Sequence, residues 1–159
     1  MKKWTYFDAL HGPGWPTPAE LEPYFLAPRG KEWSYYGGND NWGFRGQGLY
    51  GTEALTPMAG RVDVGLSMTG HPQLGVYLYY SKWDGRVARK SGYSSKNDMT
   101  RLREWVRSAH GSPLPVGLFV PFATAWKAVK EFIETDGELP KSIEWIASID
   151  VPPGTFPDP

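Results

Sequence analysis

The strongest constraint on the fold is a two-residue alternation of apolar and polar or small side chains between residues 62 and 69. The apolar positions are Val62, Val64, Leu66 and Met68. Successive side chains of a strand point to opposite faces, so this period predicts a strand with one buried face. Residues 74–83 are apolar on both faces and predict a central strand. The tight turn Asp84-Gly85 then leads into a third strand over 86–90, which completes an antiparallel meander.

Helical patterns lie on both sides of this meander. Thr17 can cap a helix, with Pro18 at its first position and Glu20 reaching back to the cap. The strongest helix begins at Pro121 and ends at Asp136-Gly137, where Gly137 suits a left-handed conformation. Its apolar stripe consists of Phe122, Ala125, Trp126, Val129, Phe132 and Ile133. A third helix is predicted over 95–109, because apolar residues recur there at helical spacing.

Shorter elements complete the prediction. We expect strands over 3–7, 33–36 and 142–149, a weak strand over 50–55, and a glycine-rich loop over 37–48. The fold class is therefore α+β, an antiparallel β-sheet (meander) with two or three helices packed mainly on one face. Residues 1–151 form a single domain, and 152–159 are expected to be a disordered, proline-rich C-terminal tail.

Composition excludes several classes of function. The chain has 159 residues with 17 Lys and Arg against 17 Asp and Glu, so it has no general attraction to nucleic acid. It has no cysteine, which rules out disulfides and thiolate chemistry and makes zinc sites unfavourable. The apolar stretch at the N-terminus is too short for a signal peptide, and no run is long enough to span a membrane. We expect a cytoplasmic protein that binds neither membrane nor nucleic acid directly.

Motifs for catalysis are missing from the sequence. His11, His71 and His110 each precede Gly or Pro, which is typical of turns, and none has a metal-ligand spacing. There is no nucleophile elbow and no phosphate-binding loop. We therefore expect no enzyme activity, no cofactor and no metal. An acidic cluster at one helix end leaves open a hydrolase with a non-contiguous site. Its members are Glu131, Glu134, Asp136 and Glu138.

Aromatic residues are abundant, with 8 Trp, 9 Tyr and 7 Phe. Aromatic rings on a framework rich in turns suit a recognition surface. The predicted partner-binding residues lie in and beside the glycine-rich segment: Tyr35, Tyr36, Asp40, Trp42, Phe44 and Arg45. Two alternatives stay open. Trp42 and Phe44 could fold back and plug the end of the sheet. Exposed rings such as Tyr35, Trp42 and Trp83 would also suit a carbohydrate-binding module.

The C-terminal third carries a resemblance to a known family. The residues that carry it are Val120, Pro121, Glu131, Phe132, Gly137, Pro140 and Trp145. Together they resemble the first-numbered Imm family of bacterial polymorphic-toxin immunity proteins. The resemblance implies a cytosolic inhibitor that binds a cognate secreted toxin domain tightly and stoichiometrically. It also implies nuclease- or deaminase-type toxins, delivered by contact-dependent or type VI systems and encoded by neighbouring genes.

Overall fold

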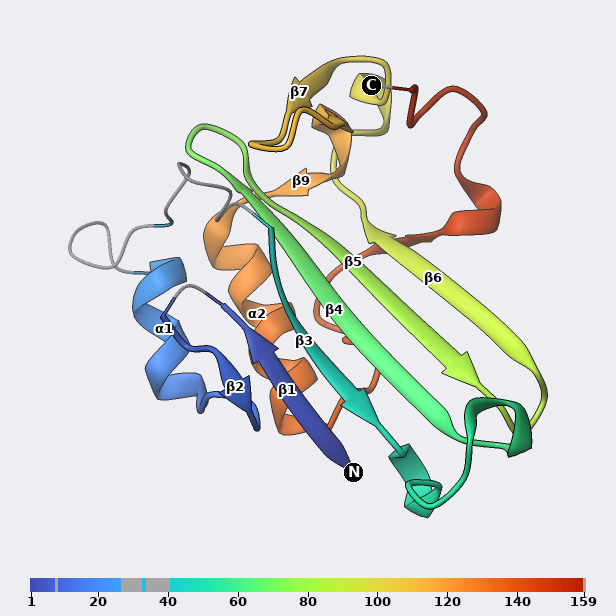
Figure 1. Cartoon of the computed structure of the whole chain (residues 1–159). Helices are drawn as coiled ribbons and strands as arrows, with labels where there is room; N and C mark the ends of the chain where they lie inside the picture. The colour runs from blue at the N-terminus through green and yellow to red at the C-terminus, as the bar shows by residue number, and fades with distance from the viewer. Residues whose placement is uncertain (8, 27–32, 34–40, 159) are drawn as a thin grey trace.

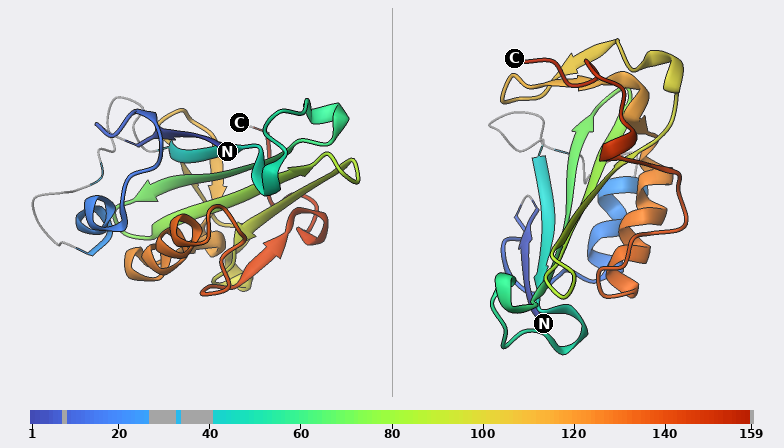
Figure 2. Two further views of the ribbon diagram at one scale, coloured as in Figure 1. Left: turned by 90° about the horizontal axis from the view of Figure 1, so that it is seen from below. Right: turned by 90° about the vertical axis from the view of Figure 1, so that its right-hand side faces the viewer.

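An eight-stranded antiparallel sheet forms the centre of the protein (Figure 1). The computed structural model describes residues 1–7, 9–26, 33 and 41–158. Strands follow the order β10-β6-β5-β4-β3-β1-β2, and β9 pairs with β5. Two α-helices in the described part of the chain lie side by side on one face of this sheet (Figure 2). The predicted α+β class is confirmed.

The elements have the following bounds. The sheet contains β1 (Lys2–Tyr6), β2 (Gly12–Pro13), β3 (Asn41–Gln47), β4 (Val62–His71), β5 (Gly75–Asp84), β6 (Arg89–Ser95), β9 (Phe119–Val120) and β10 (Trp145–Ala147). The helices are α1 (Pro18–Leu26) and α2 (Phe122–Glu134). A separate hairpin contains β7 (Trp105–Arg107) and β8 (Pro113–Pro115).

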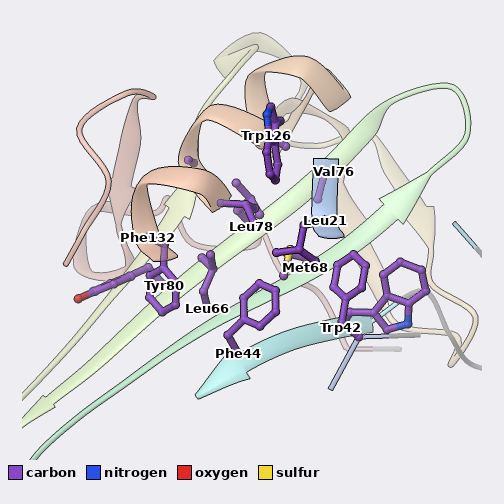
Figure 3. Packing of buried hydrophobic residues seen from close by; sticks show 14 of the residues in the cluster. Leu21, Trp42, Phe44, Leu66, Met68, Val76, Leu78, Tyr80, Trp126 and Phe132 are labelled. Carbon is purple, nitrogen blue, oxygen red and sulfur yellow. The ribbon is translucent and has the colours of Figure 1, made fainter. Parts of the chain in front are cut away.

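The alternation on β4 directs one face of the sheet toward the helices. Its four apolar side chains, from Val62 to Met68, are buried there. β5 contributes Val76, Leu78 and Tyr80 to the same face. Figure 3 shows Leu66, Met68, Val76, Leu78 and Tyr80 of these strands beneath Trp126 and Phe132 of α2. The amphipathic stripe predicted for α2 is thus its buried face.

The end of α2 is fixed by Gly137, as the sequence predicts. Gly137 has a φ of 97°, and its amide donates to the carbonyl of Phe132 over 2.9 Å. A Cβ at this position would lie 2.9 Å from a methyl group of Val64. The carbonyl of Gly137 accepts a hydrogen bond of 2.8 Å from the hydroxyl of Tyr80. Burial raises the pKa of Tyr80, so this hydroxyl stays a donor.

The glycine-rich segment differs from the prediction. Residues 41–47 form β3, which pairs with both β1 and β4, so the predicted loop over 37–48 is wrong for this part. Its glycines permit close packing within the sheet: a Cβ on Gly43 would lie 2.9 Å from the carbonyl oxygen of Leu66. Trp42 and Phe44 point toward the helices and are each 1% exposed.

The helix predicted over 95–109 does not form. The chain instead completes β6, makes one 3₁₀ turn at Met99–Arg101 and enters β7. Tertiary hydrogen bonds explain the difference. The hydroxyl of Ser95 accepts from the amide of Leu78 over 2.9 Å and donates to the carbonyl of Leu118 over 2.6 Å. These bonds hold the start of the segment in the sheet and prevent a helical N-terminus there.

Several shorter predictions are also corrected. The strand predicted over 86–90 begins at Arg89, because residues up to 88 form the hairpin turn. The strand predicted over 50–55 is replaced by a 3₁₀ turn at Leu49–Gly51. The strand predicted over 142–149 is limited to Trp145–Ala147. Of the strand predicted over 33–36, only Trp33 lies within the described residues, where it is buried outside any strand.

The end of the chain is packed against the domain. Thr155 is 2% exposed, and its carbonyl accepts a hydrogen bond of 2.9 Å from the indole of Trp105. The ring of Phe156 lies 6.2 Å from that of Tyr77. The disorder predicted for the tail is therefore wrong for these residues. No helix among the described residues has the length and apolar character needed to cross a membrane.

We predict that Trp42→Ala destabilises the protein by about 3–5 kcal/mol, because it leaves a cavity in an aromatic core. The Trp42 ring lies 4.3 Å from those of Phe7 and Trp33. Trp42→Phe should cost clearly less, since the buried indole N–H has no hydrogen-bond partner among the described residues. Urea unfolding measures both. Met58→Ala, at a position 86% exposed, is the control, and a Trp42→Ala loss no larger than that of the control would contradict this packing.

His71 makes the turn between β4 and β5 sensitive to pH. Its Nδ1 accepts from the amides of Gln73 and Leu74, each over 3.2 Å, and burial lowers its pKa from the ordinary 6.5. The neutral ring is therefore favoured in the folded state. The unfolded chain binds more protons in this range, so stability should fall as pH drops below 6.5. Unfolding titrations between pH 8 and 5 should show this loss reduced in His71→Asn, whose amide oxygen accepts without titrating. An unchanged pH dependence would contradict the assignment.

Candidate interaction surface

The face of the sheet opposite α1 and α2 is not covered by either helix (Figure 2). It carries a hollow among the described residues. Side chains that alternate with the buried ones point to it, and they surround a cavity of about 630 Å³. We call this surface the open face. Its members are Trp4, Tyr6, Gly43, Arg45, Asp63, Gly65, Ser67, Tyr79, Ser81, Trp83 and Lys90.

Small residues form the floor of the open face and aromatic rings form its walls. Gly43, Gly65 and Ser67 lie on the central strands β3 and β4. Trp4 and Tyr6 stand on β1 on one side, 39% and 55% exposed. Tyr79 and Trp83 stand on β5 on the other side. Three strand spacings separate β1 from β5, roughly 14 Å, which is wide enough for one secondary-structure element of a partner.

The unpaired charges on the open face are positive. Asp63 is neutralised by Arg61, whose Nε and Nη2 contact both carboxylate oxygens at 2.9–3.1 Å. The side chains of Arg45 and Lys90 are exposed and have no hydrogen-bond or ion-pair partner among the described residues. A protein with no net charge thus presents a locally cationic surface here.

A second groove of about 840 Å³ continues from the open face toward β7 and β8. The two hollows share Ser67 and Tyr79. Hydroxyl groups dominate the lining of the second groove, and the chain end with Thr155 and Phe156 forms part of it. Tyr77 at its floor is hydrogen-bonded to Ser94 over 3.0 Å, and burial raises the pKa of Tyr77 to about 12. The Tyr77 hydroxyl therefore stays protonated at neutral pH.

The structure separates the six predicted partner-binding residues. Arg45 is exposed on the open face. Trp42 and Phe44 come from the same strand but point to the core, as one of the alternatives left open by the sequence expected. The remaining three, Tyr35, Tyr36 and Asp40, lie outside the described residues.

Sequence reasoning missed most of the aromatic walls. The side chains of Trp4, Tyr6 and Tyr79 point to the face opposite the buried side chains of the sheet. The alternation was visible on β5, where tyrosines stand between apolar residues. Alternation along β3 separates Arg45 from Trp42, whereas the placement of Trp4 beside Arg45 follows from the pairing of β1 with β3.

The acidic cluster at the end of α2 lines neither of these two hollows. Lys3 contacts Asp136 over 2.6 Å, Tyr50 donates to Glu138 over 2.5 Å, and Lys130 lies 3.9 Å from Glu134. Asp63 is the one acidic side chain among the described residues that line the open face. In the described part of the chain, no three His, Asp or Glu side chains are grouped so that they could hold a metal ion.

The fold and this surface define an α+β protein with one face of its sheet sealed by helices and the other hollowed and rich in aromatic rings. A comparison with protein-family models finds a match. The model of immunity protein Imm1 matches residues 6–147, from the last residue of β1 to the last residue of β10. The chain therefore belongs to the Imm1 family of immunity proteins. No match was found among curated proteins or among solved structures.

Proposed function

We propose that this chain neutralises a cognate secreted toxin by binding it with the open face in a tight stoichiometric complex. The observation that carries the proposal is the exposed aromatic pair Trp4 and Tyr6 beside a floor of glycine and serine, in a member of an immunity-protein family. Aromatic and arginine side chains provide much of the binding energy at protein interfaces. Inhibition then needs contact alone, with no bond made or broken by the immunity protein.

The β5 wall of the open face is held in place before binding. The indole of Trp83 donates to the carbonyl of Pro57 over 3.0 Å. The hydroxyl of Tyr79 contacts that of Ser148 at 3.5 Å, and Gly92 leaves room for the Tyr79 ring. Side chains that are already ordered lose little entropy on association, which favours tight binding.

The six residues predicted from the sequence have different parts in this proposal. Arg45 contacts the toxin directly. Trp42 and Phe44 pack on the opposite face, where their burial favours the observed register of β3 beneath the interface. Tyr35, Tyr36 and Asp40 are retained as predicted contacts.

The resemblance to toxin–immunity systems supports a finer proposal about the partner. We propose a nuclease- or deaminase-type effector of a contact-dependent or type VI system, met in the cytoplasm. The toxin domain to test is the C-terminal part of a large secreted protein encoded beside the gene for this chain. The toxicity of this toxin domain in a cell that lacks the immunity protein is the baseline against which protection is measured.

Gly65→Val tests the proposed surface by adding bulk without removing a side chain. A Cβ at Gly65 meets the hydroxyl oxygen of Ser81 at 3.2 Å, and valine suits an extended strand, so the fold should be retained. The added methyl groups occupy the floor where the toxin would lie. We expect the toxin affinity to fall at least about tenfold, measured by calorimetry, and protection in a growth assay to weaken.

Ala54→Val adds similar bulk at an exposed turn outside the open face and serves as the matched control. Thermal unfolding of both variants checks that each is folded. Unchanged toxin binding by folded Gly65→Val would reject the open face as the interface. Glycan binding by the wild-type protein, with no binding of the toxin domain, would favour the carbohydrate-binding alternative instead.

A further inference from the structure

The charge of the open face limits the kind of toxin surface that can bind there. The whole chain carries 17 basic and 17 acidic side chains, so its formal net charge is zero. The open face departs from this balance, because Arg61 already neutralises Asp63 while Arg45 and Lys90 have no partner among the described residues. A partner that covers both cations must supply compensating negative charge, since an unpaired buried charge is costly.

The two cations lie on β3 and β6, with β4 and β5 between them. Arg45 on β3 is in register with Trp4 on β1 and with Gly65 on β4. Lys90 on β6 is in register with Trp83 on β5. Three strand spacings separate β3 from β6, roughly 14 Å. Each cation is thus the cross-strand neighbour of an indole ring, and Gly65 and Ser67 on β4 and Trp83 on β5 lie between the strands that carry the two cations.

We propose that the toxin element that enters the open face is acidic and places carboxylates against Arg45 and Lys90. This inference rests on the proposed function and specifies its partner. The floor of Gly43, Gly65 and Ser67 admits the backbone of that element, and the flanking indoles pack beside its carboxylates. The docking surface of a nuclease- or deaminase-type toxin then lies outside its cationic nucleic-acid groove, because two cationic surfaces would repel each other.

Nucleic acid is the competing anionic occupant, and the face is poorly suited to it. A surface that follows a phosphate backbone needs a tract of cations, and affinity grows with the number of phosphates neutralised. The open face offers two unpaired cations and keeps the carboxylate of Asp63 at its floor. A folded acidic protein surface needs only a few paired charges combined with shape and aromatic contact.

The test is the affinity of the double variant Arg45→Glu/Lys90→Glu for the neighbouring-gene toxin domain. Both side chains are exposed, so the variant should fold normally, as circular dichroism and thermal unfolding will verify. We expect Kd to rise about 100-fold or more, mainly through slower association, and the salt dependence of wild-type association to be lost. Lys127→Glu, on an exposed position of α2, is a single charge reversal away from the open face and should change Kd less than about twofold.

The possible outcomes distinguish a failure of the proposed function from a failure of the acidic docking surface alone. If the wild-type protein does not bind the toxin domain, the proposed function and this inference both fail. If the wild type binds and the double variant binds equally well or more tightly, the acidic docking surface alone is rejected. A wild-type affinity for a single-stranded 20-nucleotide oligonucleotide that matches or exceeds its affinity for the toxin domain would also overturn the inference, in favour of nucleic acid.

Discussion

The register of β4 against its neighbours is the constraint on which the rest of the structure depends. Residues with even numbers from Val62 to Met68 are buried against the helices, and the residues between them face the open side. A slip of one residue would bring Gly65 and Ser67 into the core and expose the apolar set. Ten paired positions between β4 and β5 make such a slip unfavourable. The same pairing therefore sets both the core and the shape of the open face.

This arrangement divides stability and recognition between the two faces. The helix side holds the aromatic core around Phe7, Trp42 and Phe132, where close packing leaves little tolerance for change. The open side has a floor of glycine and serine, which contributes less to packing and leaves room for another molecule. In our proposal, toxin specificity lies in the rings and charges around this floor. Those residues can differ among immunity proteins without disturbing the core.

Much of the fold could be predicted where the signal is local. The alternation on β4, the apolar stripe of α2 and the left-handed Gly137 each depend on neighbours in the sequence. β3 could not be recognised in the same way, because its glycines are explained only by the strands on either side. The segment after Ser95 has helical spacing, but hydrogen bonds to residues distant in the sequence keep it extended.

The open face carries aromatic rings, but mostly from other residues than those the sequence predicts as contacts. An abundance of aromatic residues indicated a recognition surface, and Arg45 lies on the open face. Trp42 and Phe44 were expected at the surface because glycines surround them, whereas the pleat of β3 directs both rings inward. The sequence predicts only a short strand for Trp4 and Tyr6, since no local sequence pattern shows that β1 borders a hollow. Such placement follows from strand order, which a single sequence does not reveal.

Hydroxyl-radical footprinting of the immunity protein, alone and with the toxin domain, tests the central claim most directly. Trp4 and Tyr6 are oxidisable and exposed on the open face, while Tyr50 and Met58 are exposed elsewhere. The account predicts that the complex protects Trp4 and Tyr6 strongly and leaves the oxidation of Tyr50 and Met58 unchanged. Protection of Tyr50 and Met58, with Trp4 and Tyr6 still fully reactive in the complex, would contradict it.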